Sequence, residues 1–336
     1  MIDNITLYID DFITTRNRIP EWQEYFPKPK KKKKQLPKKH HYFRRKVYNK
    51  KNRAFLLLSL RYDDEEDIFR LRINGSIRKW YYGENNRKDL NLSEIKDCMR
   101  ILSIKIGVSE ETLLNARNTK LENGITILLK SDIKSWNKCF VKHRNFNREE
   151  IESTVYFKGK VNKSGEQSNY NIKIYEKFSE IHKHDRNFYT NSAKMKMHKK
   201  LSFLRFEIDI NKVSGMTFYK DNANTMQKII FNWKKIVAEL LKRFKAIHFV
   251  DLNSKEKIID TAKLNKRDTK KHLQFKAIIE NGFYEEFEKF NASNISTNRS
   301  TKLKLFLKNF EMFLDKKTDY QKVLLVAFKK KLARLT

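Results

Sequence analysis

Alternation of apolar and polar residues constrains the fold of this chain more than any other feature of its sequence. Residues 171–177 read Asn-Ile-Lys-Ile-Tyr-Glu-Lys, and residues 203–210 read Phe-Leu-Arg-Phe-Glu-Ile-Asp-Ile. A two-residue period of β-branched and aromatic side chains predicts half-buried strands. Similar patterns predict further strands at residues 5–9, 54–62, 68–73, 121–129 and 155–160. Short, turn-rich connections between such strands favour an antiparallel sheet.

The segment after the strand at 68–73 combines a turn signal with aromatic and basic residues. Asn74-Gly75 predicts a turn, and the run from residue 76 to residue 86 predicts another strand. Arg78 and Lys79 are candidate DNA contacts in this run. Its aromatic rings could equally stack on bases or form an amphipathic sheet edge. Helical periodicity follows at 93–106, with Ser93 as the expected cap, and at 109–116.

Beyond Ser214-Gly215 the apolar residues change to a helical period. Residues 224–249 predict one long amphipathic helix, and shorter helices are expected at 271–280, 284–290, 303–314 and 320–335. We therefore expect an α+β protein, in which an antiparallel-sheet domain over 1–215 is followed by a mainly helical DNA-binding or accessory region over 216–336. No internal repeat is apparent in the sequence.

The charge of the chain indicates a polyanionic partner. The 336 residues include 74 Lys and Arg but 40 Asp and Glu, a formal net charge of +34. Abundant Tyr and Phe beside these cations favour nucleic acid over a membrane surface. The densest basic run, residues 27–53, contains prolines and like charges that oppose packing, so we expect an exposed basic arm. Its candidate contacts to the DNA backbone are Lys31, Lys32, Lys33, Lys34, Arg44 and Arg45.

Other features of the sequence exclude several classes of protein. Cys98 and Cys139 lie far apart without zinc-ligand spacing, which suits a reducing compartment. The absence of a long apolar run or a signal peptide predicts a cytoplasmic protein without a membrane partner. No GxxxxGK loop is present, which disfavours an ATPase motor.

The strands predicted at 171–177 and 203–210 carry the residues of a candidate phosphodiester site. Tyr175 offers a hydroxyl nucleophile, Glu207 offers a carboxylate for a divalent cation, and Lys177 and Arg205 offer positive charge to a phosphate. On spacing alone, a half-buried strand with an exposed charged edge is the simpler interpretation. The segment between the strands is basic and contains His182 and His184, which suit a loop over DNA better than a metal site.

Several short motifs together resemble the gene II/gene X family of filamentous-phage replication initiators. They are Met-Ile-Asp at residues 1–3, Glu-Ser-Thr-Val at residues 152–155, Tyr175-Glu-Lys177-x-x-Glu180, and Arg205-Phe-Glu207. The last two also resemble trans-acting plasmid initiators of the rolling-circle type. The motifs occur in order over residues 1–210. The resemblance implies an antiparallel-sheet nuclease domain of the HUH-like, Rep-like kind.

The resemblance also implies roles for particular residues. Tyr175 matches the nucleophile, and Glu207 matches an acidic position that serves the metal site. Lys120-Leu121-Glu122 resembles the family's Arg-Ile-Asp strand, so Glu122 is a further candidate ligand, with Glu180 as a third. The family's His-hydrophobic-His motif is absent, because Lys183 stands between the two histidines. Carboxylates would therefore supply most of the metal's ligands, which suits Mg or Mn.

The function implied by the resemblance is rolling-circle replication initiation. Such an enzyme nicks one strand of origin DNA, keeps a 5′ phosphotyrosine, and later rejoins the strand. Its partners would be double- and single-stranded origin DNA, with a host helicase and polymerase. The alternative is a non-catalytic, sequence-specific DNA-binding protein such as a repressor or packaging factor. A structural RNA-binding protein is a third, weaker interpretation.

Overall fold

The computed structural model of this chain describes most of its length. The described residues are 1–12, 22–25, 40–49, 54–63, 68–83, 88–130, 136–144, 146–152, 154–159, 169–177, 201–293, 298–315 and 319–336. Most of the basic arm expected at 27–53 lies outside these residues.

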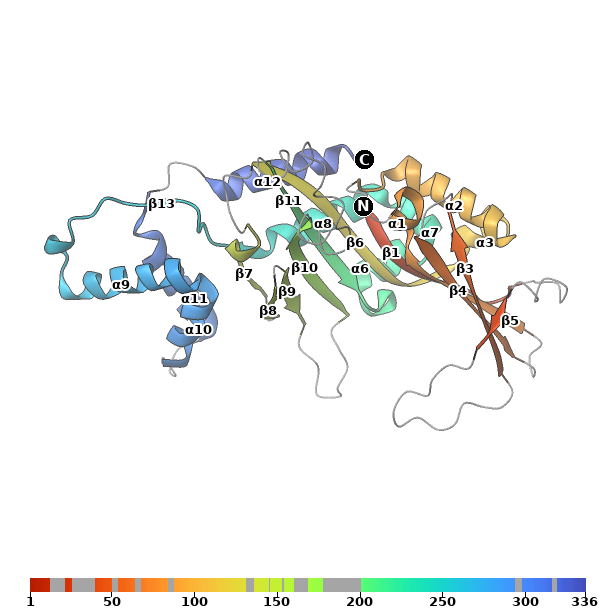
Figure 1. The fold of residues 1–336 in the computed structure, drawn as a ribbon, viewed down its shortest axis with the longest axis horizontal. Helices are drawn as coiled ribbons and strands as arrows, with labels where there is room; N and C mark the ends of the chain where they lie inside the picture. Colours follow the sequence, from red (N-terminus) through yellow and green to blue (C-terminus); the bar gives the residue numbers. More distant parts are fainter. Residues whose placement is uncertain are drawn as a thin grey trace, which may run out of the picture.

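One large antiparallel sheet dominates the fold (Figure 1). Its ten strands are β1 (Ile2–Ile9), β2 (Gln23–Glu24), β3 (His40–Tyr48), β4 (Phe55–Asp63), β5 (Ile68–Ser76), β6 (Arg117–Lys130), β8 (Asn147–Ile151), β9 (Thr154–Lys158), β10 (Tyr170–Glu176) and β11 (Leu201–Ile210). They lie in the order β2-β3-β4-β5-β1-β6-β11-β10-β9-β8, and every neighbouring pair is antiparallel. The expected class, α+β with an antiparallel sheet, is confirmed.

The strand order contains a repeat that the sequence analysis missed. In the first half β1 lies at the centre, and β2 to β5 run inward from the edge until β5 pairs with β1. In the second half β6 lies beside β1, and β8 to β11 run inward in the same way until β11 pairs with β6. The two central strands are also similar, since residues 2–7 read Ile-Asp-Asn-Ile-Thr-Leu and residues 121–127 read Leu-Glu-Asn-Gly-Ile-Thr-Ile. The extra Gly124 interrupts the match and conceals it.

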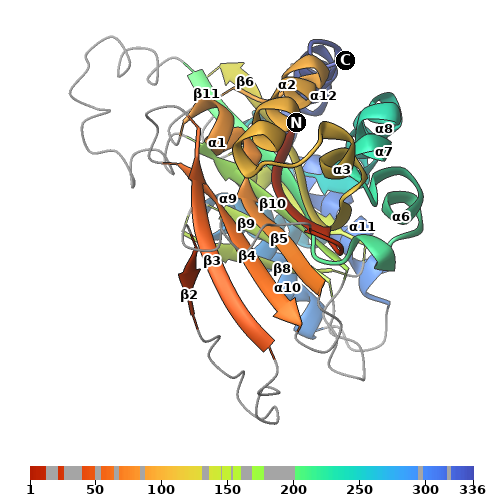
Figure 2. The same cartoon turned by 90° about the vertical axis from the view of Figure 1, so that its right-hand side faces the viewer.

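Helices cover one face of this sheet (Figure 2). They are α1 (Ile77–Tyr82), α2 (Leu92–Ile106), α3 (Glu110–Asn115), α6 (Thr217–Ala223), α7 (Met226–Phe231), α8 (Trp233–Lys245) and α12 (Tyr320–Ala333). Apolar residues of alternate strand positions face these helices in one core. For example, the Phe206 ring lies 5.2 Å from the ring of Phe244 and 5.7 Å from that of Phe328. The other face carries the polar half of each alternating pattern.

The expected strand after residue 76 is wrong, because residues 77–82 form α1. The Ser76 side chain accepts a hydrogen bond from the Lys79 backbone and caps the helix. The buried Trp80 ring donates from Nε1 to the Val47 carbonyl at 2.9 Å, which holds the helix on the sheet. Asn74 and Gly75 lie inside β5 instead of forming a turn. Tertiary burial of the aromatic residues therefore overrides their strand propensity.

Two helix boundaries also differ from expectation. Helix α2 is capped by Asn91, whose side chain accepts from the Glu94 backbone while Glu94 accepts from the Asn91 backbone. This capping box replaces the expected cap at Ser93. The single long helix expected at 224–249 is divided at Asn232 into α7 and α8. Helix α8 is followed by β12 (Ile247–Phe249), which pairs with β7 (Phe140–His143).

A second, smaller core lies in the C-terminal part of the chain. Its elements are α9 (Lys266–Asn281), α10 (Phe283–Ser293), α11 (Arg299–Glu311) and the strand pair β13 (Lys255–Glu256) and β14 (Leu314–Asp315). Phenylalanines dominate this core, and Figure 1 shows the group at one end of the molecule, away from the sheet. Short 3-10 turns lie at Trp136–Cys139, Val213–Gly215 and Thr261–Lys263.

The two cores do not divide the chain at residue 215, as the change in periodicity had suggested. Helices α6 to α8 and α12 belong to the core of the sheet. The separate helical cluster is built from residues between about 250 and 314, with Val141 added. Its apolar contacts, rather than helical periodicity, mark the smaller unit. Among the described residues, no helix is long and apolar enough to span a membrane.

Candidate active site

The register of the central strands brings the sequence-predicted residues together. Strands β10 and β11 are paired so that Tyr175 lies opposite Arg205 and Lys173 lies opposite Glu207. Strand β11 also pairs with β6, which places Gly124 opposite Glu207. The strands predicted at 171–177 and 203–210 therefore lie side by side in one sheet, as β10 and β11.

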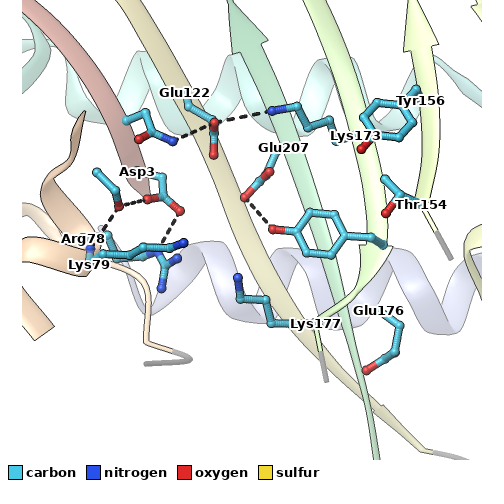
Figure 3. A pocket seen from close by; sticks show the side chains of 13 residues that line it. Asp3, Arg78, Lys79, Glu122, Thr154, Tyr156, Lys173, Glu176, Lys177 and Glu207 are labelled. Carbon is cyan, nitrogen blue, oxygen red and sulfur yellow. Dashed lines mark hydrogen bonds and ion pairs between the residues drawn. The ribbon is translucent and has the colours of Figure 1, made fainter. Parts of the chain in front are cut away.

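Three buried carboxylates meet at this point of the sheet (Figure 3). Asp3 comes from β1, Glu122 from β6 and Glu207 from β11, and one oxygen from each lies within 4.8 Å of the others. No other group of this kind occurs within the described residues. Gly124 makes the approach possible, because a Cβ there would lie 2.7 Å from the Glu207 Cγ and 2.6 Å from the Phe206 carbonyl oxygen.

Tyr175 reaches this cluster directly. Its hydroxyl donates a hydrogen bond to the Glu207 Oε1 at 3.1 Å, and the residue is 8% exposed. Tyr175, Lys177 and the three carboxylates line one cavity of about 310 Å³. The Lys177 Nζ lies 5.5 Å from the centre of the Tyr175 ring. Figure 3 shows Lys177 together with the three carboxylates at this cavity.

Arg205 has a different position from the one its motif suggested. Its guanidinium donates from Nε to Glu207 at 2.7 Å, from Nη2 to Asp3 at 3.1 Å, and from Nη1 to Asp89. The residue is 1% exposed and does not line the cavity. Burial opposes its charge, but Asp89, Glu207 and Asp3 outweigh burial and raise the pKa of Arg205 well above its usual range. Arg205 therefore holds the carboxylates in place instead of facing a phosphate.

Arg78 also serves the carboxylate cluster. Its Nε donates to the Asp3 Oδ2 at 2.8 Å, and Ser76 donates to the other oxygen of Asp3. Arg78 is 1% exposed, so its main contact is this buried pair, whereas the neighbouring Lys79 is half-buried at the cavity. Although burial opposes ionisation of Asp3, Arg78 and Arg205 hold its pKa well below the usual range.

Glu122 differs electrostatically from Asp3. Burial, followed by the charges of Glu207 and Asp3, raises the pKa of Glu122 to about 8. Lys173 at 3.6 Å and a hydrogen bond from Asn4 at 2.9 Å offset this effect only in part. Without a further cation, the site therefore keeps a proton on Glu122 near neutral pH. Metal ligands must release such protons, so a bound cation would take the proton's place.

Sequence reasoning missed three residues of the site. Asp3 lies in the Met-Ile-Asp motif, but that motif supported only the resemblance and no ligand was assigned to it. Lys173 lies two residues before Tyr175, on the same face of the strand. It bridges Glu122 and Asp209, and its Nζ lies 3.3 Å from the Asp209 Oδ2. Asp89 had no sequence signal. It accepts from the Thr126 backbone at 3.0 Å and pairs with Lys331 at 2.9 Å.

The remaining predicted contacts are only partly described. Arg44 is exposed on β3, with its guanidinium 5.2 Å from the centre of the Tyr25 ring, and Arg45 is half-buried on the next position of that strand. The predicted residues that lie outside the described part of the chain are Lys31, Lys32, Lys33, Lys34, Glu180, His182 and His184.

Comparison with known proteins adds no family to these observations. No protein-family model matches the chain, and neither the curated proteins nor the solved structures give a match.

Proposed function

We propose that this protein nicks and rejoins one strand of DNA through Tyr175, as a rolling-circle replication initiator does. The observation that carries the proposal is the hydrogen bond from the Tyr175 hydroxyl to Glu207, a member of the buried carboxylate cluster. A tyrosine nucleophile needs a group that takes its proton, because its ordinary pKa is about 10. The ten-stranded sheet would be the nicking domain.

The carboxylate cluster fits a divalent cation such as Mg or Mn. Asp3, Glu122 and Glu207 offer hard oxygen ligands from three strands. Burial, followed by the charges of Glu207 and Asp3, raises the pKa of Glu122 to about 8, and a bound cation would oppose both effects. When bound, the metal would polarise the phosphate and stabilise its developing charge.

The side chains themselves account for the movement of protons and charge. Glu207 accepts the proton of the Tyr175 hydroxyl, whose oxygen attacks the scissile phosphorus. The bond from phosphorus to the 3′ oxygen breaks, and that oxygen takes a proton from water. Lys177, which is buried beside the Tyr175 ring, balances the negative charge of the phosphate. The products are a 5′ phosphotyrosine and a free 3′ hydroxyl.

The same geometry serves the reverse reaction. A 3′ hydroxyl attacks the phosphotyrosine, and Tyr175 recovers its proton from Glu207. No nucleotide cofactor is needed, because the phosphotyrosine keeps the energy of the broken bond. In a replication cycle the free 3′ hydroxyl would prime a host polymerase, and a host helicase would separate the strands. The net charge of +34 supports origin DNA as the substrate.

The decisive experiment detects a covalent adduct. The full-length protein is incubated with Mn²⁺ and single-stranded oligonucleotides tiled across the DNA that flanks its gene. We expect one oligonucleotide to form an SDS-resistant adduct, and Tyr175→Phe to abolish it while DNA binding remains. Tyr156→Phe is the matched control, because Tyr156 lines the same cavity. Tyr189, outside the described residues, is the competing nucleophile.

Each outcome distinguishes the candidate functions. An adduct that survives Tyr175→Phe but not Tyr189→Phe would assign the chemistry to the segment between β10 and β11. Tight, sequence-selective DNA binding without any adduct would instead support a repressor or packaging factor.

A further inference from the structure

A second cavity lies on the polar face of the sheet, at the far end of β1 and β5 from the carboxylate cluster. Its volume is about 550 Å³. Arginines and tyrosines dominate its lining, which includes Tyr8, Tyr42, Arg61, Arg70, Arg72 and Arg117. None of these residues belongs to the proposed nicking site. Asp10 and Asp11 also line the cavity, so four arginines face two carboxylates there.

Strand register arranges part of this lining in a straight row across five strands. Arg44 of β3 lies opposite Ser59 of β4, and Ser59 lies opposite Arg72 of β5. Arg72 lies opposite Tyr8 of β1, and Tyr8 lies opposite Arg117 of β6. Residues directly opposite in an antiparallel sheet point to the same face. Guanidinium groups thus recur at every second strand, about 10 Å apart.

A neighbouring row concentrates the positive charge further. Tyr42 lies opposite Arg61, and Arg61 lies directly opposite Arg70. Asp10 pairs with Arg117 at 3.1 Å near the exposed rim. The Nε of Arg72 is buried and has no hydrogen-bond partner within the described residues. These features fit a bound anion with more than one negative charge.

The tyrosines indicate which kind of anion fits. The Tyr8 ring lies beside two guanidinium groups, with the Arg117 Cζ 5.2 Å and the Arg72 Cζ 5.9 Å from its centre. The rings of Tyr25 and Tyr42 lie 6.2 Å apart, edge to face. Aromatic rings interleaved with arginines form stacking surfaces for unpaired bases, whereas the bases of a duplex are already stacked.

We propose that this arginine–tyrosine groove binds single-stranded DNA, with its arginines on phosphates and its tyrosines on bases. Asn4 lines the carboxylate cavity and Tyr8 lines the groove. The two residues are four positions apart on the same face of β1, a separation of about 14 Å. One extended strand can therefore occupy both places. The groove binds a strand whether or not Tyr175 cleaves it, so binding is tested without metal.

The test measures the salt dependence of binding. The full-length protein is titrated against fluorescein-labelled dT20 in EDTA at several salt concentrations, and anisotropy reports the affinity. Arg72→Gln combined with Arg117→Gln removes two contacts, so the slope of log K against log salt falls by about 1.4. The control combines Arg100→Gln with Arg267→Gln, which removes equal charge from helices α2 and α9. Control affinity and slope should stay close to wild type.

Three results would overturn the proposal. The first is an equal loss of affinity in the groove variant and the control, which would leave only general charge attraction. The second is a loss of affinity in the groove variant that is as large for a 20-base-pair duplex as for dT20, which would exclude a preference of the groove for single strands. The third comes from Tyr8→Ala, which retains all the arginines and guards against misfolding of the double variant. Wild type should prefer dT20 to an abasic 20-mer by about fivefold or more. Tyr8→Ala should reduce that preference, and an unchanged preference contradicts the assigned stacking.

Discussion

Arg205→Gln should destabilise the protein strongly, because Arg205 neutralises three buried carboxylates from separate segments. Asp3 would keep Arg78, whose Nε lies 2.8 Å away, and Asp89 would keep Lys331 at 2.9 Å. Glu207 would lose its only ion-pair partner within the described residues. The expected cost is that of one uncompensated buried charge, about 3–5 kcal/mol. This is a large part of the 5–15 kcal/mol, roughly, by which most domains are stable.

Urea unfolding measures this effect, and a second substitution isolates its cause. In Arg205→Gln combined with Glu207→Gln the unpaired carboxylate is gone, so about 2 kcal/mol or more should return as coupling between the two sites. Arg334→Gln, a change at an exposed arginine near the C-terminus, should stay within about 0.5 kcal/mol of wild type. Mn²⁺ should raise the melting temperature of Arg205→Gln more than that of wild type, because the variant's site is more negative.

The result that refutes this reasoning is a stable variant. If Arg205→Gln loses less than about 1 kcal/mol, the buried ion-pair network does not hold the carboxylates in place. If the variant is stable yet loses strand cleavage, Arg205 faces the phosphate as its sequence motif suggested. The two roles therefore predict different observables, a loss of stability or a loss of rate.

Three further changes test other parts of the structure. Gly124→Ala should force β6 away from β11 beside Glu207, at a cost of about 1–3 kcal/mol in unfolding free energy. The variant should also bind Mn²⁺ more weakly in calorimetry. Unchanged metal affinity would contradict the close approach of the two strands. Glu207→Gln should retain DNA binding and lose most adduct formation, and full activity in excess Mn²⁺ would remove Glu207 from the site. His143 is buried beside the Tyr170 hydroxyl at 3.1 Å, and burial lowers its pKa to about 4. In the unfolded chain the His143 imidazole binds a proton near its ordinary pKa of about 6.5, so the free energy of unfolding should fall as the pH drops from 6.5 to 4, by at most about 3 kcal/mol. His143→Gln should flatten this pH dependence in urea unfolding, and an unchanged pH dependence would contradict the reasoning.

The sequence predicted the strands of the site well but not what lies behind them. A two-residue period places Tyr175 and Glu207 on one face of neighbouring strands, and their hydrogen bond follows from that register. The role of Arg205 could not be predicted in the same way. Its position depends on Asp89, which lies in an irregular segment between α1 and α2 with no pattern of its own. Only the packing of helices on the sheet brings Asp89 to β11.

The errors in secondary structure have a related cause. Residues 77–82 have the aromatic composition of a strand, yet a Ser76 cap and the burial of Trp80 make them a helix. Asn232 divides a helix whose apolar period continues through it. In both places a tertiary contact or a local hydrogen bond outweighs a pattern that extends over several residues. The boundary expected at 215 was misplaced because periodicity reports the element type and not the core that each element joins.

The repeated strand order gives these separate observations a common explanation. Asp3 and Glu122 occupy corresponding places in the two central strands, which lie side by side and bring both carboxylates to one point. The strands that follow inward differ between the halves. Strands β10 and β11 direct Tyr175 and Glu207 to this point, whereas β4 and β5 carry Arg61, Arg70 and Arg72. A nuclease that must hold a strand while cutting it needs both negative charge for a metal and positive charge for phosphates. In this sheet the carboxylates gather where β1, β6 and β11 meet, whereas the arginines of the groove lie on β4, β5 and the far end of β6.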